Sequence, residues 1–243
     1  MPGSRCLVDT ARCPVLGHAT GRFRDGTWTS QFAARGSLLK CFLNLGMQKP
    51  YSNHSADLRA AVREYQSDAD LALLLDRIGR LATDTSPAVL EAAVEPFLHI
   101  PEVAGPVYEY IVAAKPNDAR ALVVLANAYW LSGRGPDVVG DLATRAIASD
   151  PSSRGAWHLW ALTESDPRAR VARWKQVSER FLEDDLARAN LADNAASLAG
   201  AEHDVQALDL AITTYRSLLA TARQPGERAS LERAIAVLSS WRL

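Results

Sequence analysis

Cysteine is scarce in this sequence and is confined to one end of it. The 243 residues contain three cysteines, Cys6, Cys13 and Cys41, and the rest of the chain follows without another. An odd count, with spacings that match no zinc pattern, argues against a disulfide framework and against a structural zinc site. This distribution is typical of a reducing compartment, so we expect a cytoplasmic location.

The sequence also lacks a long apolar run and a strong net charge. No stretch approaches the roughly 20 continuous apolar residues that a membrane-spanning helix needs. The formal net charge is −1, so the field of the whole chain gives no reason to expect nucleic acid or an anionic membrane as the main partner. We therefore expect neither a transmembrane segment nor a nucleic-acid partner.

Motifs that carry catalysis are missing as well. The five histidines are scattered, and HExxH, Walker, GxGxxG and GxSxG motifs are absent. Asp68-Ala69-Asp70 has the DxD form, but beside Ser67 at the expected start of a helix it is typical of N-capping. The sequence thus predicts no catalytic, metal-binding or cofactor-binding residues, and no enzyme activity.

Residues 1–46 differ in composition from the rest of the chain. They contain all three cysteines, six arginines and lysines, two aspartates and no glutamate. Only the short apolar stretch Ser37–Leu45 has the pattern of a helix. Three interpretations stay open: a transit-like targeting peptide, a basic arm that binds a partner, or a stretch upstream of a true start at Met47. We treat 1–46 as an irregular or disordered basic segment and 47–243 as the folded domain.

From Asp57 onward, apolar residues recur at the spacing of one face of a helix. The first clear stripe is Leu71, Leu74, Leu75, Ile78 and Leu81. Similar stripes continue to the C-terminus, and short breaks that contain Pro, Gly, Asp or Ser separate them. Because short connections force consecutive helices to lie antiparallel, the sequence predicts an all-α fold of roughly ten stacked helices.

The most regular unit lies between two of these breaks, at Pro116 and Pro151, which stand 35 residues apart. Large, small and aromatic residues occupy set positions in its two helices. Those positions hold Leu122, Leu125, Ala126, Tyr129, Gly133, Val139, Ala143, Ala146 and Asp150-Pro151. The pattern, best at residues 119–151, resembles the tetratricopeptide repeat (TPR), a helical hairpin of 34 residues.

The flanking units resemble the repeat less closely, and the likeness covers roughly residues 87–243. In the following unit Glu164 replaces the aromatic residue, and further on Gly200 suggests a unit with a lengthened turn. The last helix, which ends near Trp241, resembles a capping helix. Because one hairpin cannot bury both of its faces, the resemblance implies a TPR-like right-handed solenoid of antiparallel helical hairpins.

The resemblance also implies a binding surface along the first helix of each hairpin, in the concave groove of the solenoid. The residues expected to line it are Arg120, Val123, Asn127, Trp130, His158 and Leu162. Trp130 lies off the core stripe, so it either lines the groove or packs against the adjacent hairpin. Asn127 matches an asparagine with which some family members hold a peptide carboxylate, but the partner lysines of that clamp are absent.

The function that follows is that of an adaptor or scaffold, which binds a peptide or protein partner in this groove. The alternatives are a self-assembling subunit, a homo-oligomer formed through the C-terminal helix and Trp241, or a non-catalytic accessory subunit of an enzyme complex. Basic residues also surround Trp174 between Arg168 and Arg180. Because the acidic residues Glu183-Asp184-Asp185 follow directly, we interpret the basic residues as part of a self-compensating solvated face and not as a phosphate site.

Overall fold

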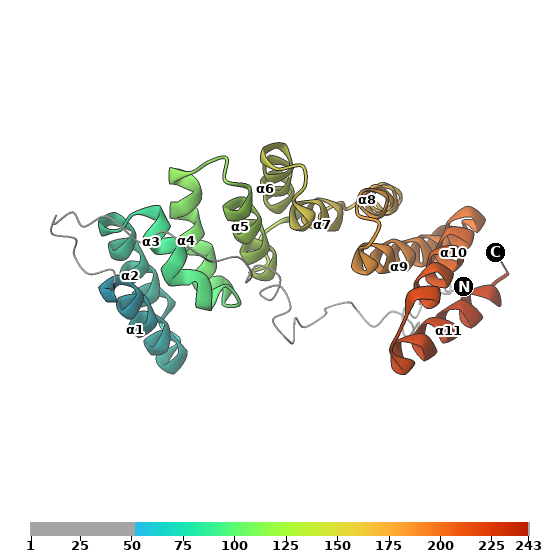
Figure 1. Cartoon of the computed structure of the whole chain (residues 1–243), viewed down its shortest axis with the longest axis horizontal. Coiled ribbons are helices and arrows are strands. Elements are labelled where there is room, and N and C mark those ends of the chain that lie inside the picture. The colour runs from blue at the N-terminus through green and yellow to red at the C-terminus, as the bar shows by residue number, and fades with distance from the viewer. Residues whose placement is uncertain (1–51, 243) are drawn as a thin grey trace, which may run out of the picture. The chain divides into compact units, whose positions relative to one another are not determined.

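The computed structural model describes residues 52–242, which form helices joined by short turns (Figure 1). The chain divides into two units, Met1–Met47 and Gln48–Leu243, and the described residues belong to the second. The expected helix at Ser37–Leu45 and the three interpretations of residues 1–46 therefore lie outside the described residues. Between residues 52 and 242, none of the helices is both long enough and apolar enough to cross a membrane.

Eleven α-helices and one 3-10 turn account for the regular structure of the described residues. They are α1 (Ser52–Asp68), α2 (Leu71–Asp84), α3 (Pro87–Val94), η1 (Glu95–Phe97), α4 (Pro101–Ala114), α5 (Ala119–Leu131), α6 (Pro136–Ser149), α7 (Arg154–Leu162), α8 (Pro167–Arg180), α9 (Asp185–Glu202), α10 (Val205–Thr221) and α11 (Pro225–Ser239). The prediction of an all-α fold of stacked hairpins is confirmed.

The helices pair in chain order, and each pair packs against the next (Figure 1). We call α1, α3, α5, α7 and α9 the A helices and α2, α4, α6, α8 and α10 the B helices. Each A helix contacts its own B helix, and each B helix contacts the following A helix. The last helix, α11, packs against α10 in the position of a further A helix. In this arrangement, one face of every A helix does not contact the B helix of its own hairpin.

The starts of the helices are encoded by residues that the sequence shows directly. Proline occupies the first helical turn where no backbone N–H is needed, as at Pro87, Pro101, Pro136, Pro167 and Pro225. Aspartate caps five helices, α8 among them, by accepting a hydrogen bond from a backbone N–H three residues on. These caps are Asp70, Asp118, Asp166, Asp184 and Asp204. Asp70 therefore has the capping role predicted for the DxD sequence.

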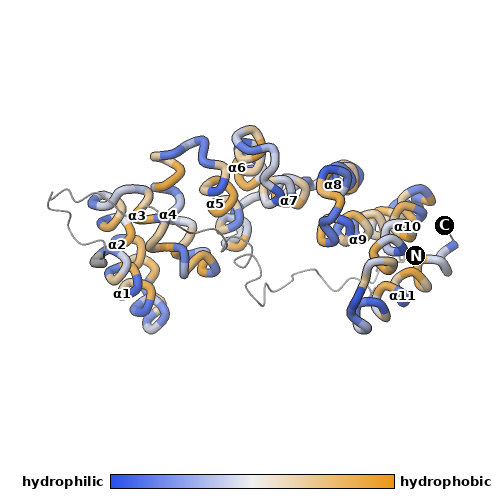
Figure 2. Tube along the Cα trace, viewed as in Figure 1, coloured by the Kyte–Doolittle hydropathy of each residue, from blue (hydrophilic) through white to orange (hydrophobic). Residues whose placement is uncertain are grey.

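Small residues sit where the helices of the best repeat approach most closely. Ala126 on α5 and both Ala143 and Ala146 on α6 are fully buried, as the repeat pattern predicts. Gly133 joins α5 to α6 with a φ of +73°, a conformation that costs glycine little and other residues more. Figure 2 shows the resulting alternation of hydrophobic and hydrophilic residues along each helix.

The buried apolar residues form two clusters that meet at α7. The first cluster runs from α1 to Leu159, and the second runs from Ala161 to α11. Trp160, which is partly buried, packs against both clusters. The short helix α7 thus contributes buried side chains to both clusters, Ala156 and Leu159 to the first and Ala161 to the second.

The stripe predicted for α2 is wider than the face that the helix buries. Leu74 and Ile78 are buried, whereas Leu71 and Leu75 are 45% and 43% exposed. The helical spacing correctly groups these residues on one side, but α2 contacts its neighbours over only part of that side.

The prediction of a lengthened turn near Gly200 is wrong. Helix α9 continues to Glu202, and His203, with a left-handed φ of 54°, makes a tight turn into α10. Gly200 is a packing residue, because a Cβ atom there would lie 3.2 Å from the ring of Trp241. Trp241, just after α11, is thus partly buried against its own chain.

Candidate functional site

The predicted site residues on α5 begin with Arg120 and Asn127, which lie two turns apart on the outer face of the helix. Both are exposed, and the opposite side of α5 carries the buried residues Leu122, Leu125 and Ala126. Asn127 makes no side-chain hydrogen bond with any described residue. Of these two residues, Asn127 presents its amide to solvent, whereas the guanidinium of Arg120 is engaged in ion pairs.

Arg120 is held by two carboxylates of the preceding A helix and its 3-10 turn. Its Nη1 lies 2.5 Å from Glu91 Oε1, and its Nη2 lies 2.6 Å from Glu95 Oε2. Lys115 Nζ also approaches Glu91, at 3.5 Å. Exposed ion pairs stabilise a fold by only about 0.2–1 kcal/mol, so their main effect is to fix the direction of the Arg120 guanidinium. The sequence pattern did not reveal the two glutamates, which stand 29 and 25 residues from Arg120 in the chain.

Val123 and Trp130 lie on the side of α5 that packs inward. A Cβ atom at Gly155 would be 3.1 Å from Val123 Cγ1, so Val123 packs against the first turn of α7. Trp130 is partly buried against the first apolar cluster. Of the two interpretations of Trp130, the structure supports packing, with part of the ring left exposed.

His158 connects α7 to the start of α9. Its Nε2 lies 2.7 Å from Asp184 Oδ2, and the two side chains are only 13% and 5% exposed. The carboxylate of Asp184 also caps α9 by accepting from Ala187 N, and Arg154 Nε lies 3.7 Å from it. Burial alone would raise the pKa of Asp184, but the bonds from His158 and Ala187 and the charge of Arg154 hold it below its ordinary value. His158 is therefore a packing residue that orients α9.

The six predicted residues thus separate into two groups. Arg120 and Asn127 form an exposed polar pair on α5. Val123, Trp130, His158 and Leu162 are partly buried, and Leu162 packs against the second apolar cluster. We call these six residues the A-helix face.

Sequence reasoning missed an open groove on the other side of α5. It has a volume of about 560 Å³ and lies between the B helices α4 and α6, with α5 as its floor. It is lined by Glu109, Val112, Ala113, Pro116, Leu125, Tyr129, Val138, Asp141, Leu142 and Arg145. We call this the α4–α6 groove. The repeat pattern assigns Leu125 and Tyr129 to the core and gives no sign that a recess reaches them.

Tyr129 is the aromatic residue at the floor of this groove. Its hydroxyl donates to Glu109 Oε1 at 2.6 Å, and the Arg134 guanidinium lies 4.5 Å from the centre of its ring. Burial, together with the hydrogen bond to Glu109, raises the pKa of Tyr129 to about 12. The hydroxyl therefore stays protonated at neutral pH and fixes the Glu109 carboxylate at the rim.

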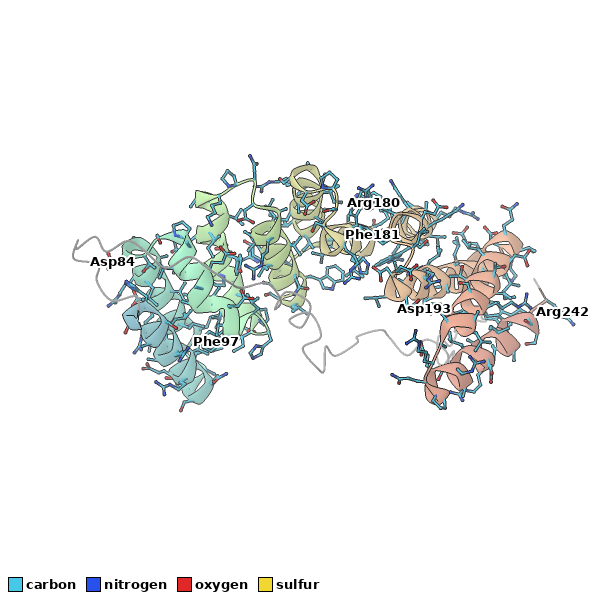
Figure 3. The ribbon with its side chains drawn as sticks, in the orientation of Figure 1. Asp84, Phe97, Arg180, Phe181, Asp193 and Arg242 are labelled. Atoms are coloured by element: carbon cyan, nitrogen blue, oxygen red, sulfur yellow. The ribbon has the colours of Figure 1, made fainter. Side chains whose placement is uncertain are left out.

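Two basic residues of α8, Arg168 and Arg173, pair with acidic groups other than those predicted. Arg168 pairs with Glu202 and Asp204, at 2.6 and 2.8 Å, and Arg173 pairs with Glu164. Arg180, labelled with Phe181 in Figure 3, donates to the Pro151 carbonyl through two nitrogens. The cluster Glu183-Asp184-Asp185 does not neutralise this helix, because Asp184 faces His158 and Arg154, and Asp185 pairs with Arg188.

Trp174, at the centre of these basic residues, is buried, with 2% of its surface exposed. It packs edge-on against His158, with ring centres 5.4 Å apart, and so offers no ring face for stacking on a base. Among the described residues, no group of three or more His, Cys, Asp or Glu side chains is placed to hold a metal ion.

Comparison with known proteins shows likeness in fold and one likeness in sequence. No family model matches the chain. A homoserine kinase of Mycolicibacterium smegmatis is 31% identical over an alignment of 181 residues, which covers 68% of this chain and 53% of that protein. The chain therefore spans about half the length of this curated relative.

Two solved structures are similar to this chain. The MamA protein superposes with a TM-score of 0.50 at 12% identity, over 72% of this chain and 100% of that one. A thermophilic TPR protein of Thermus thermophilus gives a TM-score of 0.45 at 19% identity, over 77% and 100% of the two chains. The likeness to MamA is one of fold alone, and it agrees with the order of A and B helices. The chain has the TPR-like helical-repeat fold.

Proposed function

We propose that this chain is a protein-interaction scaffold, which binds a peptide or protein segment along the A-helix face. The observation that carries the proposal is the fixed position of Arg120, held by Glu91 and Glu95 beside Asn127, whose side chain bonds to none of the residues that the structure describes. A side chain that is already ordered loses less conformational entropy when a partner binds. Rigid presentation by packed helices is the usual way in which stacked repeats make a binding surface.

Each residue of the A-helix face then has a distinct role. Arg120 and Asn127 supply hydrogen bonds to the partner, and the exposed part of Trp130 supplies apolar contact. Arginine and tryptophan are enriched among residues that dominate binding energy. Val123, Leu162 and His158 act indirectly, since they set the spacing of α5, α7 and α9. Replacing them should alter stability together with binding.

The test is recovery of the same partner by the full chain and by point variants, from extracts of the native host. Asn127→Lys replaces an exposed amide that makes no hydrogen bond within residues 52–242, so we expect loss of the co-purifying protein without loss of helix content. Gln206→Lys, an exposed amide on α10, is the matched control and should retain the partner. Equal recovery by both variants would refute the assignment of the A-helix face.

Homoserine phosphorylation is the second function to test, because the curated relative carries that name. A kinase positions nucleotide phosphates with a glycine-rich loop and a metal-binding carboxylate, and the sequence holds no Walker or GxGxxG motif. We expect the purified chain with ATP, Mg²⁺ and homoserine to release no ADP above the level seen without homoserine. ADP release that depends on homoserine would overturn the scaffold proposal as the main function.

A further inference from the structure

Asp193, labelled in Figure 3, occupies a position equivalent to that of two residues of the A-helix face. It is the ninth residue of α9, as Asn127 is of α5 and Leu162 is of α7. Residues at equal distances from the starts of equivalent helices take equivalent places in stacked hairpins. Asp193 therefore extends the A-helix face onto the next hairpin.

Where this chain replaces uncharged residues of one repeat by charged residues in the next, the charges are paired. The same counting matches Tyr129 with Glu164 in α5 and α7, and Leu142 with Arg173 in α6 and α8. Arg173 Nη2 lies 2.6 Å from Glu164 Oε2. The acid and the base that enter the second repeat thus satisfy each other.

Asp193 differs, because a hydroxyl and not a cation holds it. Tyr215, which is 5% exposed, donates its hydroxyl hydrogen to Asp193 Oδ1. The other oxygen, Oδ2, makes no hydrogen bond with any described residue and keeps contact with solvent. The earlier B helices bury apolar residues at the position of Tyr215, namely Ile111, Ala146 and Val177. Packing of a hairpin therefore does not require this hydroxyl, whose effect is to fix the direction of the carboxylate.

No basic residue of the described chain offsets the charge of Asp193. Arg188 pairs within α9, and Arg233 bonds to a serine of α11. Arg216, next to Tyr215 in the sequence, is exposed. Burial raises the pKa of Asp193, the hydrogen bond from Tyr215 lowers it, and none of the three arginines contributes. A partly buried charge without a counterion lowers the stability of a fold, so this carboxylate gains most from a cation that comes from outside the chain.

Small side chains leave Asp193 open to such a cation. Ala189 and Ala196 stand one turn before and one turn after it, at the positions where α5 has Val123 and Trp130. Both alanines are partly exposed. The apolar stem of a lysine or arginine side chain can lie across these methyl groups while its charged end reaches Oδ2.

From these observations we propose that Asp193 is a cation subsite of the A-helix face, which binds a lysine or arginine side chain of the protein segment held there. The inference rests on the proposed function, in which a segment lies along the A helices. Packed helices are about 8–10 Å apart, so Asp193 and Asn127, two A helices apart, are separated by at least roughly 16 Å. An extended segment rises about 3.3 Å per residue. Its basic residue therefore stands at least about five residues from the residue at Asn127.

The experiment measures which residues the full chain selects from a positional library of short fluorescent peptides. One position at a time is fixed as lysine, arginine, glutamine or glutamate, and the other positions are mixed. At one position we expect the unmodified chain to bind the lysine or arginine peptides at least about fivefold more tightly than the glutamine peptides, the effect of one ion pair. Asp193→Asn keeps the side-chain size and the acceptor for Tyr215 but removes the charge, so it should abolish that preference.

A control variant and a stability measurement separate binding from a structural role. Asp209→Asn, which changes an exposed aspartate of α10, should keep the preference for lysine or arginine. Asp193→Asn should unfold at a urea concentration no lower than that of the unmodified chain, because it removes a charge that the fold does not compensate. A preference that survives in Asp193→Asn, an equal loss in both variants, or a lower urea midpoint for Asp193→Asn would overturn the proposal.

Asn127→Lys distinguishes failure of the cation subsite from failure of the proposed function. If binding falls in Asn127→Lys while the preference for lysine survives in Asp193→Asn, the subsite is refuted and the scaffold proposal stands. If the unmodified chain binds none of the peptides, or Asn127→Lys binds them all as before, the A-helix face is refuted and the subsite with it.

Discussion

Replacing Asp184 with alanine should destabilise the fold more than replacing any other aspartate cap. In the folded protein this carboxylate caps α9 and also accepts a hydrogen bond from His158 Nε2 at 2.7 Å. Loss of an N-cap costs about 1 kcal/mol, and loss of a hydrogen bond to a charged group costs about 1.5–3 kcal/mol. The side chains are 5% and 13% exposed, so water replaces little of the lost interaction.

We therefore expect Asp184→Ala to lower the free energy of unfolding by about 2.5–4 kcal/mol. For a folded unit of this size each kcal/mol corresponds to about 2–4 °C in Tm, so the melting temperature should fall by roughly 5–15 °C. The assay is urea unfolding followed by circular dichroism, with thermal melts as a second measure. Asp118→Ala is the control, because Asp118 caps α5 without a histidine partner and should cost about 1 kcal/mol.

The acid dependence of stability gives an independent check on Asp184. Its pKa in the folded protein lies below the ordinary value of 3.8, so the folded state favours the ionised carboxylate. The resulting stabilisation is present above pH 3.8 and is lost as the pH falls through the lower folded pKa. Asp184→Ala should lack this part of the acid dependence. Equal destabilisation by Asp184→Ala and Asp118→Ala would refute the role given to His158.

Three other expectations follow from contacts elsewhere in the fold. Gly200→Ala should stabilise the chain by about 0.5–1 kcal/mol in a background where Trp241 is replaced by alanine. It should stabilise the chain clearly less when Trp241 is present, because the added Cβ lies 3.2 Å from the Trp241 ring. Additive effects of the two replacements in urea unfolding would contradict that contact. Arg173→Leu should lower the free energy of unfolding by about 1–3 kcal/mol because it leaves Glu164 unpaired. Adding Glu164→Tyr should recover part of that loss. No recovery would contradict the equivalence of the two repeats. Burial raises the pKa of Tyr108 from 10.0 to about 12, so the free energy of unfolding should be intact below pH 10 and fall as the pH rises toward 12. Tyr108→Phe should reduce this alkaline loss. An unchanged alkaline profile in that variant would argue against the role of Tyr108.

The sequence predicts the helices and their small packing residues well, because both depend on local spacing. Leu122, Ala126 and Ala146 recur at positions set by the geometry of a helical hairpin, and all three are fully buried. Gly133 marks its turn for an equally local reason, a positive φ. Leu71 and Leu75 belong to the predicted stripe of α2 but are exposed, since periodicity gives the direction of a stripe but not how much of it a neighbouring helix covers.

The candidate sites depend on contacts that local spacing does not encode. His158 and Asp184 are 26 residues apart, and Arg120 and Glu91 are 29 apart. Nothing in either segment alone indicates the pairing. Glycine is typical of turns, but Gly200 contacts Trp241 through tertiary packing. The α4–α6 groove becomes visible in the sequence only when Tyr129 and Leu142 are compared with Glu164 and Arg173 at matching positions.

The central claim, that the A-helix face binds a partner, is tested most directly by site-specific photo-crosslinking in the native host. The photoreactive residue p-benzoylphenylalanine would be placed at position 127, and in a second variant at position 206 on α10. We predict that position 127 yields a discrete crosslinked partner and that position 206 yields none. The same crosslinks from both positions, or a partner captured from position 206 alone, would contradict the claim.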